Sequence, residues 1–163
     1  MVSVTEDDVR ELASGLEHVE VVTASEANGA PEVAWGDSFF FYRPQGSGER
    51  AQRQPFATLV TQDYPGFDTA SDLGRPGVFR VNVGVGREAF TALFGYSPAA
   101  HADHAEAYDY AVLDRLLPHP VYATQGWVCV LNPGAETSAR LESLLRDAHA
   151  AAAKRHERRE SHG

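Results

Sequence analysis

The chain has 163 residues, 43% of them hydrophobic and 23% charged, which is typical of a globular protein and excludes a fully disordered one. Its net charge of −9 argues against binding to the phosphates of a nucleic acid. No apolar run could cross a membrane, the N-terminal residues do not resemble a signal peptide, and the single Cys129 cannot form an internal disulfide. We therefore expect a cytoplasmic protein without a membrane segment.

The first half of the chain predicts one helix followed by strands. Thr5 is suited to cap a helix, and apolar residues follow it at helical spacing. Strand-forming patterns then occupy residues 18–23, 31–42, 56–61 and 78–85. The pair Asn28-Gly29 predicts a turn between the first two strands. Residues 43–54 have almost no apolar content and include three arginines, so they predict a mobile loop.

The second half alternates helices with one more strand. The predicted elements are a helix over 86–95, a helical turn or two over 107–117, a strand over 122–131 and a final helix after Thr137. The last ten residues, 154–163, hold four basic and two acidic side chains. This tail favours a frayed, solvated helix end, whose bases complement the helix dipole, over a contact with RNA or an acidic protein.

This order of elements predicts an α+β fold. Strands that follow one another through turns and loops favour an antiparallel sheet, because parallel strands need long crossover connections. We expect a single domain over residues 1–163, with a curved antiparallel sheet of about five strands and the N- and C-terminal helices packed on one face. Neither an internal repeat nor a linker is visible in the sequence.

Several stretches together resemble a known family. WGDSFFFY, PFATLVTQDYPGFD, RPGVFRVNVGVGREAF, DRLLPHPVYATQGWVCVLNP and LESLLRDAHAAAAKRH are similar to DUF6194, a family of uncharacterised actinobacterial proteins, over roughly residues 5–159. More distantly, the chain resembles the MmcQ/YjbR group. That resemblance implies a CyaY-like fold with a curved antiparallel sheet and hints at small-molecule metabolism. The DNA binding suggested for that group is disfavoured here by the net charge.

An acidic residue interrupts an aromatic row in the second predicted strand. In an unbroken pleat, Trp35 and Asp37 share a face with the following phenylalanines. Such an acid must be paired, protonated or beside a cavity, and there its pKa would rise and suit acid–base chemistry. Alternatively, Gly36 marks a bulge that turns Asp37 to solvent.

The strand over 78–85 presents Arg80 and Asn82 opposite its apolar face. In a sheet covered on one side only, that opposite face is simply wet. Alternatively, the two side chains line an open concave face and clamp a carboxylate or amide of a ligand.

His119 lies between two prolines just before the last strand. A histidine held by rigid backbone is suited to be a general base or a hydrogen-bond donor, and equally to make an ordinary turn contact. Asp114 could orient it, or could pair with a base such as Arg115. Asp63 and Tyr64 begin a Pro-Gly turn, where they form turn contacts or the rim of a pocket.

The segment around residues 101–106 carries metal-capable side chains, but the sequence gives them no third ligand at defined spacing. His101, His104 and Glu106 therefore favour a polar loop over a metal site. Cys129 lies two residues after Trp127 in a predicted strand, and this pattern predicts a thiol packed in the core. We expect neither a metal nor a cofactor.

These residues lead to one functional hypothesis and two alternatives. The leading hypothesis is a small-molecule-binding protein, or a cofactor-free enzyme in which Asp37 and His119 form an acid–base pair and Arg80 holds an anionic group. The expected ligand-binding residues are Trp35, Asp63, Tyr64, Arg80, Asn82, Asp114, Tyr122 and Trp127. The first alternative is a protein-interaction or homodimerisation module without catalysis, and nucleic-acid binding ranks third.

Overall fold

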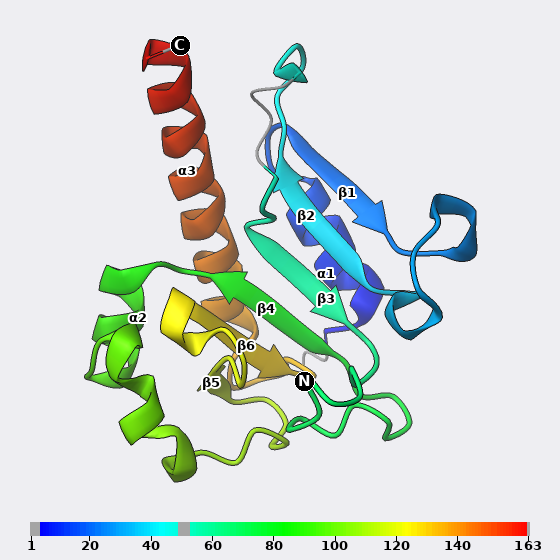
Figure 1. The fold of residues 1–163 in the computed structure, drawn as a ribbon, viewed down its shortest axis with the longest axis vertical. Helices are drawn as coiled ribbons and strands as arrows, with labels where there is room; N and C mark the ends of the chain where they lie inside the picture. The colour runs from blue at the N-terminus through cyan, green and yellow to red at the C-terminus, as the bar shows by residue number, and fades with distance from the viewer. Residues whose placement is uncertain (1–3, 49–52, 163) are drawn as a thin grey trace.

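The computed structural model describes residues 4–48 and 53–162. Part of the loop predicted to be mobile, including Arg50, lies outside the described residues. The described part forms one open antiparallel sheet with helices on one side (Figure 1). The predicted α+β class is therefore confirmed. No described helix combines the length and the apolarity that crossing a bilayer requires.

Six strands form the sheet, one more than the sequence suggested, in the order β1-β2-β3-β4-β6-β5. Every pair of neighbours is antiparallel. The strands are β1 (Val19–Thr23), β2 (Ser38–Tyr42), β3 (Ala57–Val60), β4 (Arg80–Gly84), β5 (Leu116–Pro118) and β6 (Trp127–Leu131). β4 is central because it pairs with both β3 and β6, so its side chains have neighbours on both sides.

The first and last helices cover one face of the sheet, behind it in Figure 1. They are α1 (Glu6–Ser14) and α3 (Ser138–His162), and a third helix, α2 (Arg87–Phe94), follows β4. At the start of α1, the Asp8 N–H donates to Thr5 Oγ1 and the Thr5 N–H donates to Asp8 Oδ2, which is a capping box.

The alternation of side chains along the strands builds the main core between the sheet and these helices. Successive side chains point to opposite faces, so every second residue of a strand faces the helices. The buried side chains of this core include Val9, Ala13, Phe40, Leu59, Val81, Val83, Val128, Leu141 and Leu145.

The opposite face of the sheet is partly covered by loops. Leu73, from the loop after β3, packs with Val60, Leu117 and Leu131 in a second, smaller apolar cluster. Arg75 ties this loop to the segment before β5, since its Nη2 donates to the carbonyl of Ala111 at 2.8 Å. The uncovered remainder of this face lies beside Arg80 and Asn82.

Three predicted elements differ from the structure. The predicted strand over 31–42 begins only at Ser38, because a short 3₁₀ turn, Glu32–Ala34, precedes it and Gly36 takes a positive φ of 93°. The helical turn predicted over 107–117 is wrong, since its last residues form β5. The strand predicted from residue 122 begins at Trp127, after the 3₁₀ turn Ala123–Gln125.

Candidate functional site

A pocket of about 480 Å³ opens on the face of the sheet that the helices leave free. Strands β2, β3, β4 and β6 provide its floor, and the loops after β3 and β5 provide its walls. Its lining residues are Phe39, Gln54, Pro55, Thr58, Val60, Tyr64, Phe67, Asp68, Arg80, Asn82, His119, Tyr122, Gln125 and Trp127. Apolar walls with a few convergent polar groups are typical of a small-molecule site.

Arg80 is the central polar group of this floor. Its side chain is 1% exposed, because β4 is central in the sheet and the loop after β3 covers it. Its guanidinium forms a bidentate ion pair with Asp68, with Nη1–Oδ1 at 3.0 Å and Nη2–Oδ2 at 2.5 Å. This pairing lowers the pKa of Asp68 even though burial alone would raise it.

The remaining hydrogens of Arg80 also have neighbours. Nε donates to Asn82 Oδ1 at 2.8 Å and Nη1 donates to Ser71 Oγ at 2.9 Å, while Nη2 lies 3.3 Å from His119 Nε2. Asn82 in turn donates to Thr58 Oγ1 at 2.9 Å, across the β3–β4 pair. The expectation that this face is wet is therefore wrong, and the carboxylate that Arg80 clamps belongs to Asp68.

His119 is held by two backbone donors at Nδ1, so the proton of the neutral ring lies on Nε2. The backbone N–H groups of Val121 and Tyr122 donate to Nδ1 at 3.0 and 2.9 Å, and Arg80 approaches Nε2. A protonated ring would face N–H donors on both sides. Burial first, and the charge of Arg80 second, lower the pKa of His119 to about 3, so the imidazole is neutral at physiological pH.

Asp37 lies behind the pocket wall and is fully buried. Its Oδ1 accepts hydrogen bonds from the Thr61 N–H at 2.9 Å and from Thr61 Oγ1 at 3.3 Å, and its Oδ2 accepts one from the Tyr64 hydroxyl. Burial raises the pKa of Asp37 against the lowering effect of these bonds. Of the two alternatives for this acid, the buried, hydrogen-bonded one describes the structure, although Asp37 does not line the pocket.

Aromatic side chains form the upper walls. Trp127 lies so close over β4 that a Cβ on Gly84 would come to 3.0 Å from its indole ring, so a larger residue there would require the ring to shift. Tyr122 packs beside His119 with a ring-centroid distance of 5.0 Å, and Phe67 lies 6.0 Å from Tyr122. Phe67 and Tyr122 are 58% and 37% exposed, which leaves apolar surface open at the rim.

The structure brings together six of the predicted site residues in this pocket: Tyr64, Arg80, Asn82, His119, Tyr122 and Trp127. Besides Asp37, three others lie elsewhere. Trp35 follows the 3₁₀ turn before β2 and donates from Nε1 to the carbonyl of Ala30. Asp63 accepts a hydrogen bond from the Leu73 N–H and organises the loop after β3. Asp114 is the third.

Asp114 caps helix α3 rather than orienting His119. Its carboxylate accepts hydrogen bonds from the backbone N–H groups of Gly134, Glu136 and Thr137 and from the Thr137 hydroxyl. These bonds lower the pKa of Asp114, because they stabilise its charged form. Arg115 is not its partner either.

Sequence reasoning missed several lining residues, of which Asp68 matters most. Asp68 lies twelve residues before Arg80 in an irregular loop, and no periodicity links the two. The sequence offered one signal, since a buried arginine needs a carboxylate partner. That signal does not identify which acidic residue is the partner until the path of the loop after β3 is known. The other missed lining residues are Phe39, Gln54, Pro55, Thr58, Val60, Phe67 and Gln125.

The histidines of residues 101–106 take part in an aromatic cluster. Both ring nitrogens of His101 contact tyrosine hydroxyls, Nδ1 that of Tyr96 at 3.0 Å and Nε2 that of Tyr110 at 3.1 Å. His104 stacks on Tyr96 with centroids 3.9 Å apart. Within residues 4–48 and 53–162, no three metal-capable side chains converge. Cys129 is buried, and burial raises the pKa of its thiol, as expected of a core residue.

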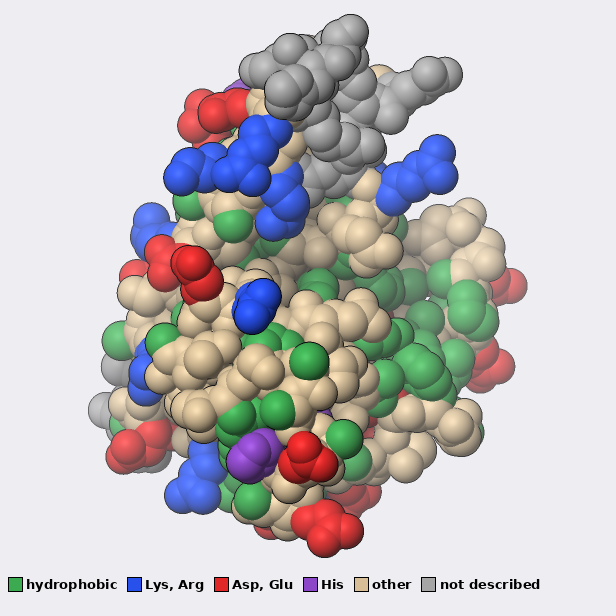
Figure 2. All heavy atoms as spheres, turned by 60° about the vertical axis from the view of Figure 1, so that its left-hand side comes forward, with side chains coloured by type: hydrophobic (Ala, Val, Ile, Leu, Met, Phe, Trp, Pro, Cys, Tyr) green, Lys and Arg blue, Asp and Glu red, His purple; other side chains and the backbone are tan. Residues whose placement is uncertain are grey.

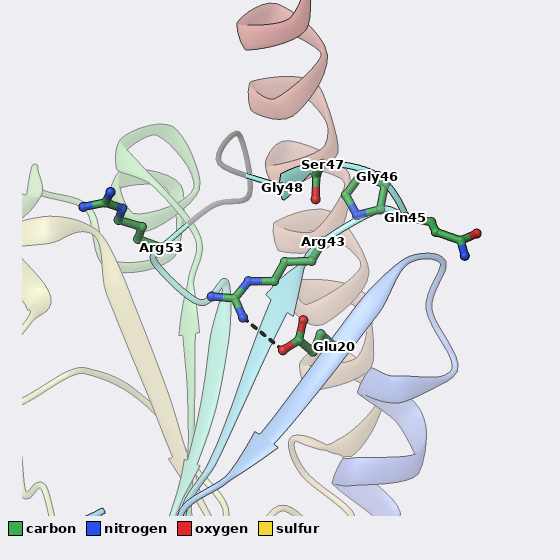
Figure 3. A pocket seen from close by; sticks show the side chains of 8 residues that line it. Glu20, Arg43, Gln45, Gly46, Ser47, Gly48 and Arg53 are labelled. Atoms are coloured by element: carbon green, nitrogen blue, oxygen red, sulfur yellow. Dashed lines mark hydrogen bonds and ion pairs between the residues drawn. The ribbon is translucent and has the colours of Figure 1, made fainter. Parts of the chain in front are cut away.

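A shallower hollow of about 900 Å³ lies beside the loop between β2 and β3. Figure 3 shows Arg43 donating to Glu20 at 3.1 Å, while Arg53 points away from that pair. The guanidinium of Arg43 also covers the ring of Phe41 at 3.8 Å. The other described lining residues are Pro44, Gln45, Gly46, Ser47 and Gly48, so the charged groups of this hollow are the Arg43–Glu20 pair and Arg53.

Comparison with known proteins gives one match. The model of a family of unknown function, DUF6194, matches residues 4–161. No curated protein and no solved structure matches the chain significantly. Because the family model spans nearly the whole chain, including every lining residue of the pocket, this protein belongs to the DUF6194 family.

Proposed function

We propose that this protein binds a small organic molecule in the pocket between Arg80 and Trp127. The observation that carries the proposal is a buried, hydrogen-bonded arginine at the floor of an aromatic-walled cavity of about 480 Å³. Folding alone does not favour such a group, because burying an ion pair is often no more stabilising than burying apolar residues of similar size. A buried polar floor that adjoins a cavity suits ligand recognition.

The same contacts favour binding over acid–base catalysis. His119 is a weak base whose acceptor nitrogen Nδ1 already receives two backbone hydrogen bonds, and both carboxylate oxygens of Asp37 accept hydrogen bonds behind Tyr64. An acid–base pair needs groups within reach of the substrate, which Asp37 is not in this arrangement. We therefore propose a binding protein, and the acid–base pair stays a prediction. The lone buried Cys129 fits a reducing compartment, so we place this function in the cytoplasm.

The chain supplies its own reporter for a test. It has two tryptophans, Trp127 in the pocket wall and Trp35 outside it. The variant W35F leaves a single indole N–H signal in a ¹H–¹⁵N correlation spectrum, and that signal reports the pocket. We expect members of a library of small aromatic fragments to shift it at millimolar concentration. The variant W127F, which keeps only the Trp35 signal, is the matched control and should show no such shifts.

Two results would contradict the proposal. One is a fragment library that leaves the Trp127 signal unmoved. The other is a set of fragments that shifts the signals of Trp35 and Trp127 alike, which indicates general surface adsorption.

A second candidate function is self-association. Phe39 and Phe41 are only half-buried on the open face of β2, and β1 beside them is an edge strand. A homodimer that pairs two β1 edges would cover this edge and continue the sheet from one copy into the other. Light scattering after size exclusion at about 100 μM measures the oligomeric state. A wild-type dimer that the variant Val22→Lys converts to a monomer supports the interface. A wild-type protein that is monomeric contradicts it.

A further inference from the structure

We propose that the ligand of this pocket is electrically neutral, flat and aromatic, with an amide-like or carbonyl group for hydrogen bonding. This inference rests on the proposed function and adds the chemical class of the ligand. It follows from which charges, hydrogen-bonding groups and apolar surfaces of the lining remain unused.

The charges of the lining cancel. Among its described residues the only ionised side chains are Asp68 and Arg80, and they pair with each other through two hydrogen bonds. His119 adds no positive charge, because its Nδ1 accepts two backbone N–H bonds and its Nε2 lies 3.3 Å from the Arg80 guanidinium, which disfavours a second proton. A charged ligand would therefore lose its hydration without gaining a counter-ion, which is costly.

Four of the five N–H donors of Arg80 are occupied, and the fifth faces the buried ring of His119. Nε and Nη1 donate to Asn82, Ser71 and Asp68, and Nη2 donates to Asp68 and faces His119. A ligand carboxylate could bind the guanidinium only by displacing Asp68, which would leave that carboxylate unpaired. The sequence-based expectation that Arg80 holds an anionic group is therefore replaced by a structural role for the guanidinium in the floor.

Neutral hydrogen-bonding groups remain available around the cavity. The indole Nε1–H of Trp127 donates to none of the described residues, and the side-chain amides of Gln54 and Gln125 are likewise without a described partner. Thr58 Oγ1 accepts a bond from Asn82 and keeps its own hydrogen to donate. This set of donors and amides matches a carbonyl or amide better than it matches a formal charge.

The shape of the walls favours a planar ring. Phe39, Phe67, Tyr122 and Trp127 all line the cavity, and Phe67 and Tyr122 leave 58% and 37% of their surface exposed. Flat ligands cover such faces by stacking, which adds to the burial of apolar area. A volume of about 480 Å³ accommodates one molecule of two or three fused rings with substituents.

The test compares three probes of one shape at pH 7: 2-naphthamide, which is neutral, 2-naphthoate, which is anionic, and 2-naphthylmethylammonium, which is cationic. Each is titrated into the W35F variant while the Trp127 indole signal is followed. We expect the amide to bind about tenfold or more tightly than either ion, since an ion has no free partner in the lining. Equal or tighter binding of an ion overturns the inference, while small-molecule binding itself stands.

A charge variant tests the cause. Asp68→Asn leaves the charge of Arg80 uncompensated, so we expect the preference to change from the amide to 2-naphthoate. Asp103→Asn, which changes the same charge at an exposed position away from the pocket, should keep the preference for the amide. An unchanged preference in D68N overturns the inference. If D68N does not fold, the wild-type ranking of the three probes decides alone.

Failure of all three probes, while other fragments shift the Trp127 signal, overturns the inference and leaves the proposed function in place.

Discussion

At the scale of single residues, the pocket depends on polar side chains that satisfy one another. Arg80, Asp68 and Asn82 form a closed network beneath the cavity, and His119 is packed against it. Breaking such a network by removing one partner is expensive, because the other keeps a buried charge without compensation. The network therefore defines both the stability of the floor and its electrical neutrality.

His119 makes this network sensitive to acid. Its pKa is about 3 in the folded protein and near 6.5 in an unfolded chain, so unfolding takes up a proton between these values. Stability is therefore complete above pH 6.5 and falls as the pH decreases towards 3. His119→Asn keeps an acceptor for the two backbone N–H groups but cannot be protonated. We expect wild type to lose roughly 2–3 kcal/mol more than H119N between pH 6.5 and pH 4.5.

Urea unfolding at these two pH values measures the difference. His101, whose pKa is also lowered by burial, remains in both proteins and contributes equally to both. Parallel losses of stability in wild type and H119N would contradict the environment described for His119.

At the scale of elements, one carboxylate connects a loop to the longest helix. Asp114 has a φ of 52° and places its oxygens against the N–H groups of Gly134, Glu136 and Thr137, in the turn that leads into α3. These bonds fix the turn directly before Ser138, so an acceptor from elsewhere in the chain stabilises the helix start. The positive φ of Asp114 also interrupts helical backbone geometry directly before β5.

Asp114→Asn tests this cap without straining the backbone, because asparagine tolerates positive φ. The amide offers one acceptor oxygen instead of two and no charge, so we expect a loss of about 1 kcal/mol in the free energy of unfolding. Urea unfolding at pH 7 measures it. D103N, at an exposed position, should stay within about 0.5 kcal/mol of wild type, and a D114N variant as stable as that control would contradict the cap.

The elements also show how far a sequence predicts this site. Alternation in residues 78–85 placed Arg80 and Asn82 opposite the apolar face, and the first and last helices followed from their apolar spacing. Residues 107–117 carry helix-compatible spacing, but pairing of Leu116 and Leu117 with β6 overrides it. Asp68 and Phe67 reach the pocket through the path of a loop, which local patterns do not encode.

At the scale of the whole molecule, the two faces of the sheet have separate tasks. One face packs on α1 and α3 and holds the main core, while the other holds the pocket. On the face that Figure 2 shows, basic and acidic side chains both occur. In Figure 2, basic side chains gather near the C-terminal end of α3, and acidic ones lie beside them and further down.

This distribution and the net charge of −9 predict weak interaction with nucleic acids. We expect no change in the fluorescence anisotropy of a labelled DNA duplex or single-stranded RNA at about 150 mM salt. A sequence-independent increase in anisotropy that disappears with added salt would contradict this and would point to the basic end of α3.

The separation of floor and rim has a practical consequence for engineering. Phe67, Tyr122 and Gln125 stand on loops and on a 3₁₀ turn, whereas the apolar core lies on the far side of the sheet. A mutant library confined to these three positions should alter selectivity while the melting temperature stays nearly constant, which makes this scaffold suitable for evolving sensors of small aromatic compounds.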